Sequence, residues 1–389
     1  MAKRLRLGLV GCGHRGVYIT SLFRDHPAWT VTAIMDTYPA CVSAAVEKLK
    51  LPEARTYTDF DKMLRDAPVD AIFFAPDPRA QAELACRAMA TGRHACTEVP
   101  AAFTLKDCWN LVKTVEKTGC QYLLMEQTRY SGYFEDWAEM NQRGEFGHVC
   151  LAQGEYVHYE RNWNYWTNTE TGEMSYDFTP PEGWRAKPTW RYEVLGDPIY
   201  YLPHTLSPLL KVLDDRVVRV SCMGTQRRSY TYDSPELPWR DIEYALMHTK
   251  KDTVLVVGAG FSLPHVPRGP LHAHWYEIRG TKASVTSPRY AEDSFRLWRQ
   301  GSKTYESVTV SQVPRGATEA EAKTGHGGTD FKTIELFTDA ILGVRPLEMN
   351  VYRAMETAAP AILAAESARR GGAMMDVPEF RPDARSRRA

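Results

Sequence analysis

The sequence predicts an α/β protein with an N-terminal doubly wound (Rossmann) domain, followed by an α+β domain with a large, open, mostly antiparallel sheet. Two observations lead to this prediction. Up to about residue 125, short apolar runs alternate with helical patterns of ten to fifteen residues, as in βαβ units. After a predicted helix at about 132–143, the apolar runs are longer, alternate with polar residues and are joined by turns, as in an antiparallel sheet.

Predicted strands of the first domain are continuous apolar runs, which are typical of a parallel sheet buried on both faces. They are RLRLGLV, WTVTAIMD, VDAIFFAPD, HACTEV and CQYLLMEQ. The second domain has candidate strands in HVCLAQGEYVHYE, VVRVSCMGTQRR, ALMHTKKDTVLVVGAGFS, HAHWYEIRGTKASVTSP and SFRLWRQGSKTYESVTV. Residues 162–198 are rich in Trp, Tyr, Pro and Gly without a clear period, so we expect an irregular functional loop there. The helical runs FKTIELFTDAILG and YRAMETAAPAILAAESARRG follow near the end.

Length and charge restrict the class of protein. With 389 residues, 43% of them hydrophobic, the chain can form two domains: residues 1–125 for the cofactor and 126–375 for substrate, catalysis and oligomerisation, with a tail at 376–389. Its 48 Lys and Arg balance 48 Asp and Glu, and the basic end RPDARSRRA is typical of a disordered tail, so no nucleic-acid partner is predicted. Glycines interrupt the first apolar run after six residues, which excludes a signal peptide or membrane span. Eight scattered cysteines predict a cytoplasmic protein.

A glycine-rich loop follows the first predicted strand and opens the first helix. Its residues are Gly11, Cys12, Gly13, His14, Arg15 and Gly16. The glycines permit a tight turn and close approach of a pyrophosphate to the helix N-terminus. Asp36, 20 residues after Gly16 at the end of the second strand, can accept ribose hydroxyls and repel a 2′-phosphate. The cofactor predicted is therefore NAD rather than NADP.

Two further segments lie where the carboxyl edge of the predicted sheet would bind a ligand. In APDP, Pro76 and Asp77 are either cofactor contacts or simply a helix start, with Asp77 as its cap. In TEVP, Glu98 is another candidate cofactor contact. No lysine accompanies that glutamate, because position 99 is Val99.

With GCGHRG, APDP, TEVP and the following sheet, the chain resembles the Gfo/Idh/MocA superfamily of NAD(P)-dependent oxidoreductases over nearly its whole length. In its sugar and polyol dehydrogenases the segment equivalent to TEVP typically reads EKP, and the lysine assists proton transfer. Val99 cannot carry a proton. Those enzymes also often have Asp four residues before the catalytic histidine, where this chain has Tyr200.

Both departures match a narrower branch, the NAD-dependent glycoside hydrolases resembling family 109. The motifs TEVPAA, MEQTRY, GEYVHY, YLPH, GHGGTDF and VYRAMETAAP occur in the same order. The resemblance implies a catalytic centre at Glu126, Tyr156, Tyr201 and His204. The family usually has asparagine after the glutamate, where this chain has Gln127. Taken alone, each tyrosine or histidine is more often a core or surface residue.

The resemblance also implies a mechanism. A sugar is transiently oxidised at C3, the aglycone is eliminated across C1–C2, water adds and the ketone is reduced again, so NAD ends as it began. His204 suits the base for the hydroxyl proton, Tyr201 could share or orient that proton, and Tyr156 suits the base for C2–H. His272 and His274 alternate on one strand face without a carboxylate at useful spacing, and no metal is predicted.

The substrate expected is a small-molecule glycoside, either a hexosaminide or an anionic, sulfoquinovoside-like sugar. Aromatic and guanidinium groups of the irregular segment could stack on a sugar or pair with an anion. The candidate substrate residues are Arg161, Trp163, Arg185 and Arg191, with His326 in the GHGG turn. A plain NAD-dependent sugar dehydrogenase with net NADH production is the alternative function, and a non-enzymatic NAD-binding sensor is a third. The open sheet predicts a homodimer or homotetramer.

Overall fold

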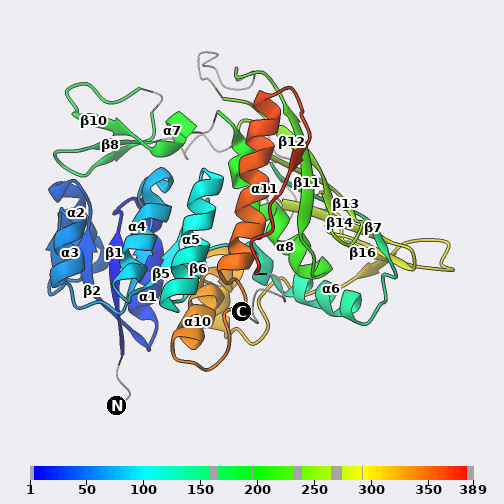
Figure 1. Ribbon diagram of the computed structural model, residues 1–389, viewed down its shortest axis with the longest axis horizontal. Coiled ribbons are helices and arrows are strands. Elements are labelled where there is room, and N and C mark those ends of the chain that lie inside the picture. The colour runs from blue at the N-terminus through cyan, green and yellow to red at the C-terminus, as the bar shows by residue number, and fades with distance from the viewer. Residues whose placement is uncertain are drawn as a thin grey trace. The chain divides into compact units, whose positions relative to one another are not determined.

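The computed structural model describes residues 4–157, 159, 165–177, 179–194, 196–228, 230, 239–263, 274–290 and 292–382. These fold as two compact units (Figure 1). Unit 1 contains residues 1–125, 162–194 and 333–355, and unit 2 contains residues 126–161, 195–332 and 356–389. The predicted class, a Rossmann domain plus a domain built on one large sheet, is confirmed.

Unit 1 is built on a six-stranded parallel sheet in the order β3-β2-β1-β4-β5-β6. Its strands are β1 (Leu5–Val10), β2 (Trp29–Met35), β3 (Arg55–Tyr57), β4 (Ala71–Phe74), β5 (His94–Thr97) and β6 (Tyr122–Leu124). The helices between them are α1 (His14–Asp25), α2 (Pro39–Leu49), α3 (Phe60–Asp66), α4 (Pro78–Ala90) and α5 (Leu105–Thr118). All four residues of β4 are buried, as continuous apolar strands require.

Side-chain caps fix where several of these helices begin. Asp59, Asp77 and Thr104 accept hydrogen bonds from first-turn N–H groups of α3, α4 and α5. The strand β2 is anchored by Trp29, which is fully buried. Its ring stacks on Phe337 and its Nε1 donates to Thr338 Oγ1 at 2.7 Å, both on α10 (Thr329–Ile341). These contacts explain why residues 333–355 belong to unit 1.

The prediction of an irregular loop at residues 162–198 is wrong for the part of this segment that the structure describes. Strands β8 (Trp166–Asn168), β9 (Met174–Ser175) and β10 (Ala186–Pro188) form a small antiparallel sheet, followed by α7 (Trp190–Val194). Lys187 on β10 lies 5.5 Å from the ring centroid of Tyr38, and an added Cβ at Gly172 would lie 3.1 Å from Ala40 O. The segment therefore packs within unit 1, not with the second domain as predicted.

Unit 2 is built on a nine-stranded sheet in the order β17-β16-β15-β14-β7-β13-β12-β11-β18. The strands are β7 (Val149–Val157), β11 (Val217–Gly224), β12 (Glu243–Thr249), β13 (Val254–Gly260), β14 (His274–Gly280), β15 (Ala283–Thr286), β16 (Phe295–Arg299), β17 (Glu306–Val308) and β18 (Met375–Asp376). Among the strands that the structure describes in this sheet, only β7 and β13 pair in parallel, so the sheet is mostly antiparallel, as predicted.

Helices and turns complete unit 2. They are η1 (Thr128–Tyr130), α6 (Gly132–Gln142), η3 (Pro198–Tyr201), α8 (Pro203–Leu213), α9 (Glu319–Ala322), η5 (Gly325–Gly328) and most of α11 (Val351–Arg369). Gly154 of β7 lets α8 approach the sheet, because a Cβ there would lie 2.5 Å from Thr205 Cγ2 and 3.0 Å from Tyr276 Cδ1. One face of the sheet is therefore closed by α8.

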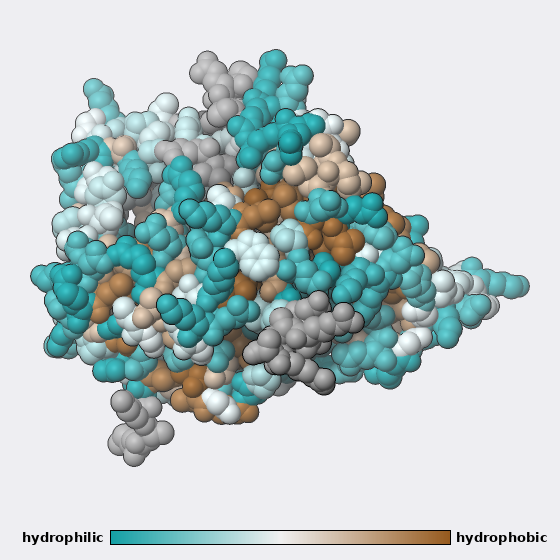
Figure 2. Space-filling view, in the orientation of Figure 1, coloured by the Kyte–Doolittle hydropathy of each residue, from teal (hydrophilic) through white to brown (hydrophobic). Residues whose placement is uncertain are grey.

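The opposite face of this sheet carries apolar side chains that remain exposed. Leu246, Met223 and Val254 are 52%, 67% and 39% exposed. Figure 2 shows that hydrophobic residues also reach the surface close to α11. Met223 lies near Gly372, because a Cβ there would lie 2.8 Å from Met223 Cε. Exposed apolar faces of this kind commonly mark protein contacts.

The predicted tail at 376–389 is too long. Asp376 pairs with Arg219 of β11, Phe380 is 2% exposed, and Arg381 forms an ion pair with Glu356 at 2.6 Å. The chain is thus packed into unit 2 as far as the description extends, to residue 382. None of the helices in the described ranges combines the length and apolar character needed to span a bilayer.

Candidate functional site

The glycine loop of unit 1 has a backbone that only glycine tolerates at two positions. Gly11 has φ +97°, and a Cβ there would lie 2.5 Å from the backbone of Ala75 and Pro76 at the end of β4. A Cβ at Gly16 would lie 2.0 Å from Gly11 O. The loop therefore packs backbone against backbone, which brings the start of α1 close to the carboxyl ends of β1 and β4.

The N-terminus of α1 is open toward a ligand. Its N-cap is Gly13, and no described side chain caps its first turn. Asp36 accepts hydrogen bonds through Oδ2 from Cys12 N at 2.8 Å and through Oδ1 from Tyr38 N at 3.1 Å. The carboxylate thus ties the glycine loop to the end of β2 while remaining partly exposed. An uncapped helix N-terminus beside a strand-end carboxylate fits the pyrophosphate and ribose of a dinucleotide.

A cavity of about 620 Å³ lies over this edge of the unit 1 sheet. All ten predicted cofactor residues line it: Gly11, Cys12, Gly13, His14, Arg15, Gly16, Asp36, Pro76, Asp77 and Glu98. Burial, Lys48, Arg15 and Arg191 lower the pKa of His14, in that order, so His14 is neutral at pH 7. The volume suits a cofactor.

Two predicted residues in the cavity also have structural partners. Asp77 caps α4 by accepting from Arg79 N at 3.0 Å, and this contact together with Arg79 lowers its pKa despite the opposing effect of burial. Glu98 accepts from Arg15 Nε at 2.7 Å. The helix-start interpretation of APDP is correct, and the cofactor contacts of both carboxylates stay predictions.

The small sheet of unit 1 adds residues to the cavity that the sequence did not single out. Tyr165 and Lys187 line it, and a Cβ at Gly13 would lie 3.2 Å from Tyr165 Oη. Arg191, predicted to bind substrate, lies in the same lining, whereas Arg185 is exposed and outside it. Arg161 and Trp163 lie outside the described residues. The aromatic and basic composition of this segment was visible, but its placement on the cofactor domain depends on tertiary packing.

A second cluster lies within unit 2, and it contains all four predicted catalytic residues. Glu126 is fully buried, and its Oε1 accepts hydrogen bonds from Thr128 N at 3.2 Å and His204 Nδ1 at 2.9 Å. Because a carboxylate accepts and does not donate, Nδ1 of His204 carries a proton. Its Nε2 is then the nitrogen able to accept another.

Two tyrosine rings flank His204. The ring of Tyr156 meets it edge to face at 5.3 Å, and the ring of Tyr201 lies nearly parallel at 6.1 Å. Phe261 packs against both tyrosines, at 5.4 and 4.9 Å. Tyr156, Tyr201 and His204 are 9%, 3% and 7% exposed, so the three side chains are nearly buried.

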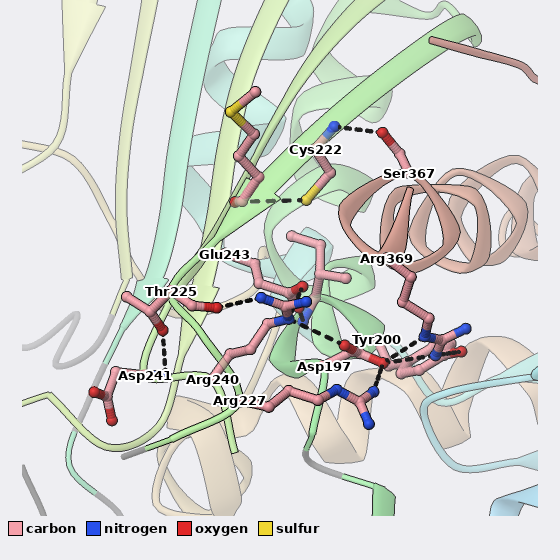
Figure 3. A network of polar contacts seen from close by, with 12 residues as sticks. Asp197, Tyr200, Cys222, Thr225, Arg227, Arg240, Asp241, Glu243, Ser367 and Arg369 are labelled. Carbon is pink, nitrogen blue, oxygen red and sulfur yellow. Dashed lines mark hydrogen bonds and ion pairs between the residues drawn. The ribbon is translucent and has the colours of Figure 1, made fainter. Parts of the chain in front are cut away.

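An arginine-rich network holds the segment that leads into His204 (Figure 3). Asp197, 1% exposed, accepts from Arg227 at 2.5 Å, from Arg240 at 3.3 Å and from Arg369 at 2.6 Å. Glu243 accepts from Ile199 N at 3.0 Å, just before Tyr200 and Tyr201. These contacts fix η3 from three directions. Their residues are far apart in sequence, so no local motif could have indicated them.

In the part of the chain that the structure describes, the His326 ring hydrogen-bonds to Asp330 and not to a residue of this cluster. Its Nδ1 contacts Asp330 Oδ2 at 2.8 Å, and its side chain is 51% exposed. Its φ of +53° places it in the left-handed region, as the glycine-rich turn indicates. Within the described ranges, no group of three His, Cys, Asp or Glu side chains is placed to hold a metal ion.

Two family models match successive parts of the chain. A family model described as "Oxidoreductase family, NAD-binding Rossmann fold" matches residues 5–126, and one described as "Glycosyl hydrolase 109, C-terminal domain" matches residues 136–385. A glycosyl hydrolase family 109 protein of Saccharopolyspora erythraea is 26% identical, over 97% of this chain and 83% of its own length. One from Bacteroides thetaiotaomicron is 25% identical, over 97% and 85%. An Agrobacterium radiobacter oxidoreductase solved with NAD+, L-tartaric acid and magnesium superposes with TM-score 0.72 at 17% identity, over 96% of this chain and 98% of that one.

Proposed function

Because the chain belongs to glycosyl hydrolase family 109 and carries an NAD-binding Rossmann domain, we propose that it is an NAD-dependent glycosidase. It cleaves its substrate by transient oxidation at C3, elimination of the aglycone across C1–C2, addition of water and re-reduction. The observation that supports this route best is the pairing of a carboxylate-oriented histidine with a nearly buried tyrosine in unit 2. Two proton acceptors of different kinds suit a route that removes two different protons.

His204 is the base for the C3 hydroxyl in this proposal. Glu126 holds its Nδ1–H, so Nε2 takes the hydroxyl proton and the carboxylate stabilises the resulting imidazolium. NAD, when bound, supplies the reversible oxidation at this carbon. Tyr201, stacked beside the imidazole, orients the same hydroxyl.

Tyr156 is the base for C2–H. A ketone at C3 makes the neighbouring C2 proton removable, and the phenolate oxygen takes it as the C1 bond to the aglycone breaks. The low exposure of Tyr156 keeps water away from the carbanion-like transition state. In the second half of the reaction the same hydroxyl returns a proton to C2 as water adds at C1.

Two substrate classes fit the proposal, a hexosaminide and an anionic sugar glycoside of the sulfoquinovoside type. A panel of neutral and anionic aryl glycosides, assayed with and without added NAD, distinguishes them. Release of aglycone without net change in nicotinamide absorbance supports the glycosidase. Steady NADH formation from a free sugar, without aglycone release, would instead support the alternative function, a sugar dehydrogenase.

The decisive test follows the C2 proton. Hydrolysis in heavy water should place deuterium at C2 of the released sugar, and Tyr156→Phe should lower turnover about 10²- to 10⁴-fold, the range for general acid–base catalysis. Binding of NAD should be unchanged in this variant. Tyr305→Phe, at a tyrosine 45% exposed, is the matched control and should leave turnover intact. Product that retains protium at C2 would contradict the mechanism.

A further inference from the structure

His274 lies directly across the sheet from Tyr156. The two residues are paired in the antiparallel register of β14 and β7. Their rings are stacked, with centroids 4.2 Å apart and planes 11° from parallel. Because paired residues on one face of a sheet are neighbours, this contact is built into the register and does not depend on a loop.

The hydrogen bonds of Tyr276 determine which nitrogen of His274 carries a proton. Tyr276 is fully buried, and burial raises the pKa of its hydroxyl well above the usual range, so it keeps its proton. That single proton is donated to the main-chain oxygen of His204 at 2.8 Å, since a carbonyl can only accept. His274 Nδ1, 3.0 Å from the same hydroxyl, must therefore be the donor in that contact.

Because Nδ1 already carries a proton, a second proton on the His274 imidazole goes to Nε2. His274 is partly exposed, unlike Tyr156 and Tyr276, so exchange of that proton with solvent is possible. Among the residues that the structure describes, the other titratable groups whose rings or hydrogen bonds meet this pair are His204 with its partner Glu126 and Tyr201 on η3. Phe261, at the end of β13, brings no charge. The side chains of Glu155 and Trp275 belong to the opposite sheet face, because neighbours along a strand alternate.

We propose that His274 is a positioning residue for the reaction: it holds the ring of Tyr156 and, protonated at Nε2, places a positive charge against the face of the phenolate. This rests on the proposed function in assigning Tyr156 as the base. The proton on Nε2 comes from solvent, while the phenolate receives its own proton from C2, so no proton passes between the two rings. The chain from His274 through Tyr276 to the backbone of His204 fixes the same imidazole relative to the second base.

A role in packing alone makes a different prediction from a role in charge. His274→Phe keeps a flat ring that can stack on Tyr156 but has no proton to carry. His274→Asn keeps a short N–H donor for Tyr276 but loses the ring. If only packing matters, the phenylalanine variant should behave as the unmutated protein does. If charge matters, both variants should disfavour the phenolate.

The experiment places 3-fluorotyrosine at position 156 and follows its ionisation by fluorine NMR as pH is raised, without substrate. In both variants we expect the midpoint pH of ionisation to rise by about 1–3 pH units, the range for an opposite charge within a few ångströms. Circular dichroism and thermal unfolding establish that each variant is folded. An unchanged midpoint in the phenylalanine variant would overturn the proposal.

The titration is independent of glycosidase activity, so the two proposals can fail separately. Retention of protium at C2 refutes the elimination mechanism but leaves the fluorine result to decide the contact between His274 and Tyr156. Conversely, deuterium at C2 with an unmoved midpoint keeps the glycosidase and removes His274 from it. In active protein, the acid limb of the turnover profile, where Tyr156 becomes protonated and can no longer act as a base, should move toward higher pH in His274→Phe, which a loss of packing alone does not produce.

Discussion

Replacing Asp36 tests both the cofactor preference and the tethering role that the structure adds to it. In Asp36→Ala, the ribose of NAD loses a charged hydrogen-bond acceptor, worth about 1.5–3 kcal/mol. That corresponds to a roughly 10- to 150-fold increase in Kd for NAD. NADP should be weakened less, because the carboxylate that repels its 2′-phosphate is gone and Lys48 and Lys187 line the same cavity. The Kd for NADP divided by the Kd for NAD should therefore fall at least about tenfold.

The structure predicts a second loss that affects both cofactors equally. Cys12 is buried, and its N–H donates to Asp36 at 2.8 Å. Without that acceptor the buried donor costs about 1–3 kcal/mol, which should lower the thermal stability of the protein and loosen the glycine loop. Calorimetric titration with NAD and NADP separates the effects, because loop loosening changes both affinities and ribose recognition changes their ratio.

Asp59→Ala is the matched control for this comparison. Asp59 caps α3 by accepting from Lys62 N at 2.7 Å and lies outside the cavity lining. Its loss should cost about 1 kcal/mol of stability without changing the cofactor ratio. Equal affinities of the unmutated protein for NAD and NADP, or an unchanged ratio in Asp36→Ala, would refute the assignment of Asp36 to the ribose.

Two further predictions concern unit 2. Burial, and next the charge of Asp197, raise the pKa of Glu243 to about 8, so between pH 5 and 8 the folded state binds more protons than the unfolded state and stability falls as pH rises. In urea unfolding, the free energy of unfolding of Glu243→Gln should depend less on pH over this interval. The same pH dependence as in the unmutated protein would contradict its assignment to Glu243. Light scattering should give a dimer or tetramer, and Leu246→Glu, on the open sheet face, should lower the mass while leaving the fold intact. A monomer before mutation would refute the association proposed, and Lys303→Glu, in the turn between β16 and β17, serves as the charge control.

The family and the cofactor were accessible from the sequence because their signals are local. A glycine loop needs its glycines at fixed offsets, since Gly11 has a left-handed φ and Gly16 packs on the backbone of Gly11. Asp36 follows at the distance set by one helix and one strand. The motifs MEQTRY, GEYVHY and YLPH likewise each occupy a few consecutive residues, and they supplied His204 and the three side chains that the structure gathers around it.

What only the tertiary structure decided depends on contacts between distant residues. The segment carrying Lys187 and Arg191 has a composition suited to substrate or cofactor, and only its packing on Tyr38 places it in the cofactor cavity. From the sequence, His274 could only be grouped with His272 on one strand face, and no metal site was predicted there. Alternation along a strand indicates which face a side chain is on, but it does not indicate which residue of a neighbouring strand lies beside it. The stacking of His274 on Tyr156 required the register between β14 and β7, which is set by the whole sheet and by no short stretch of sequence.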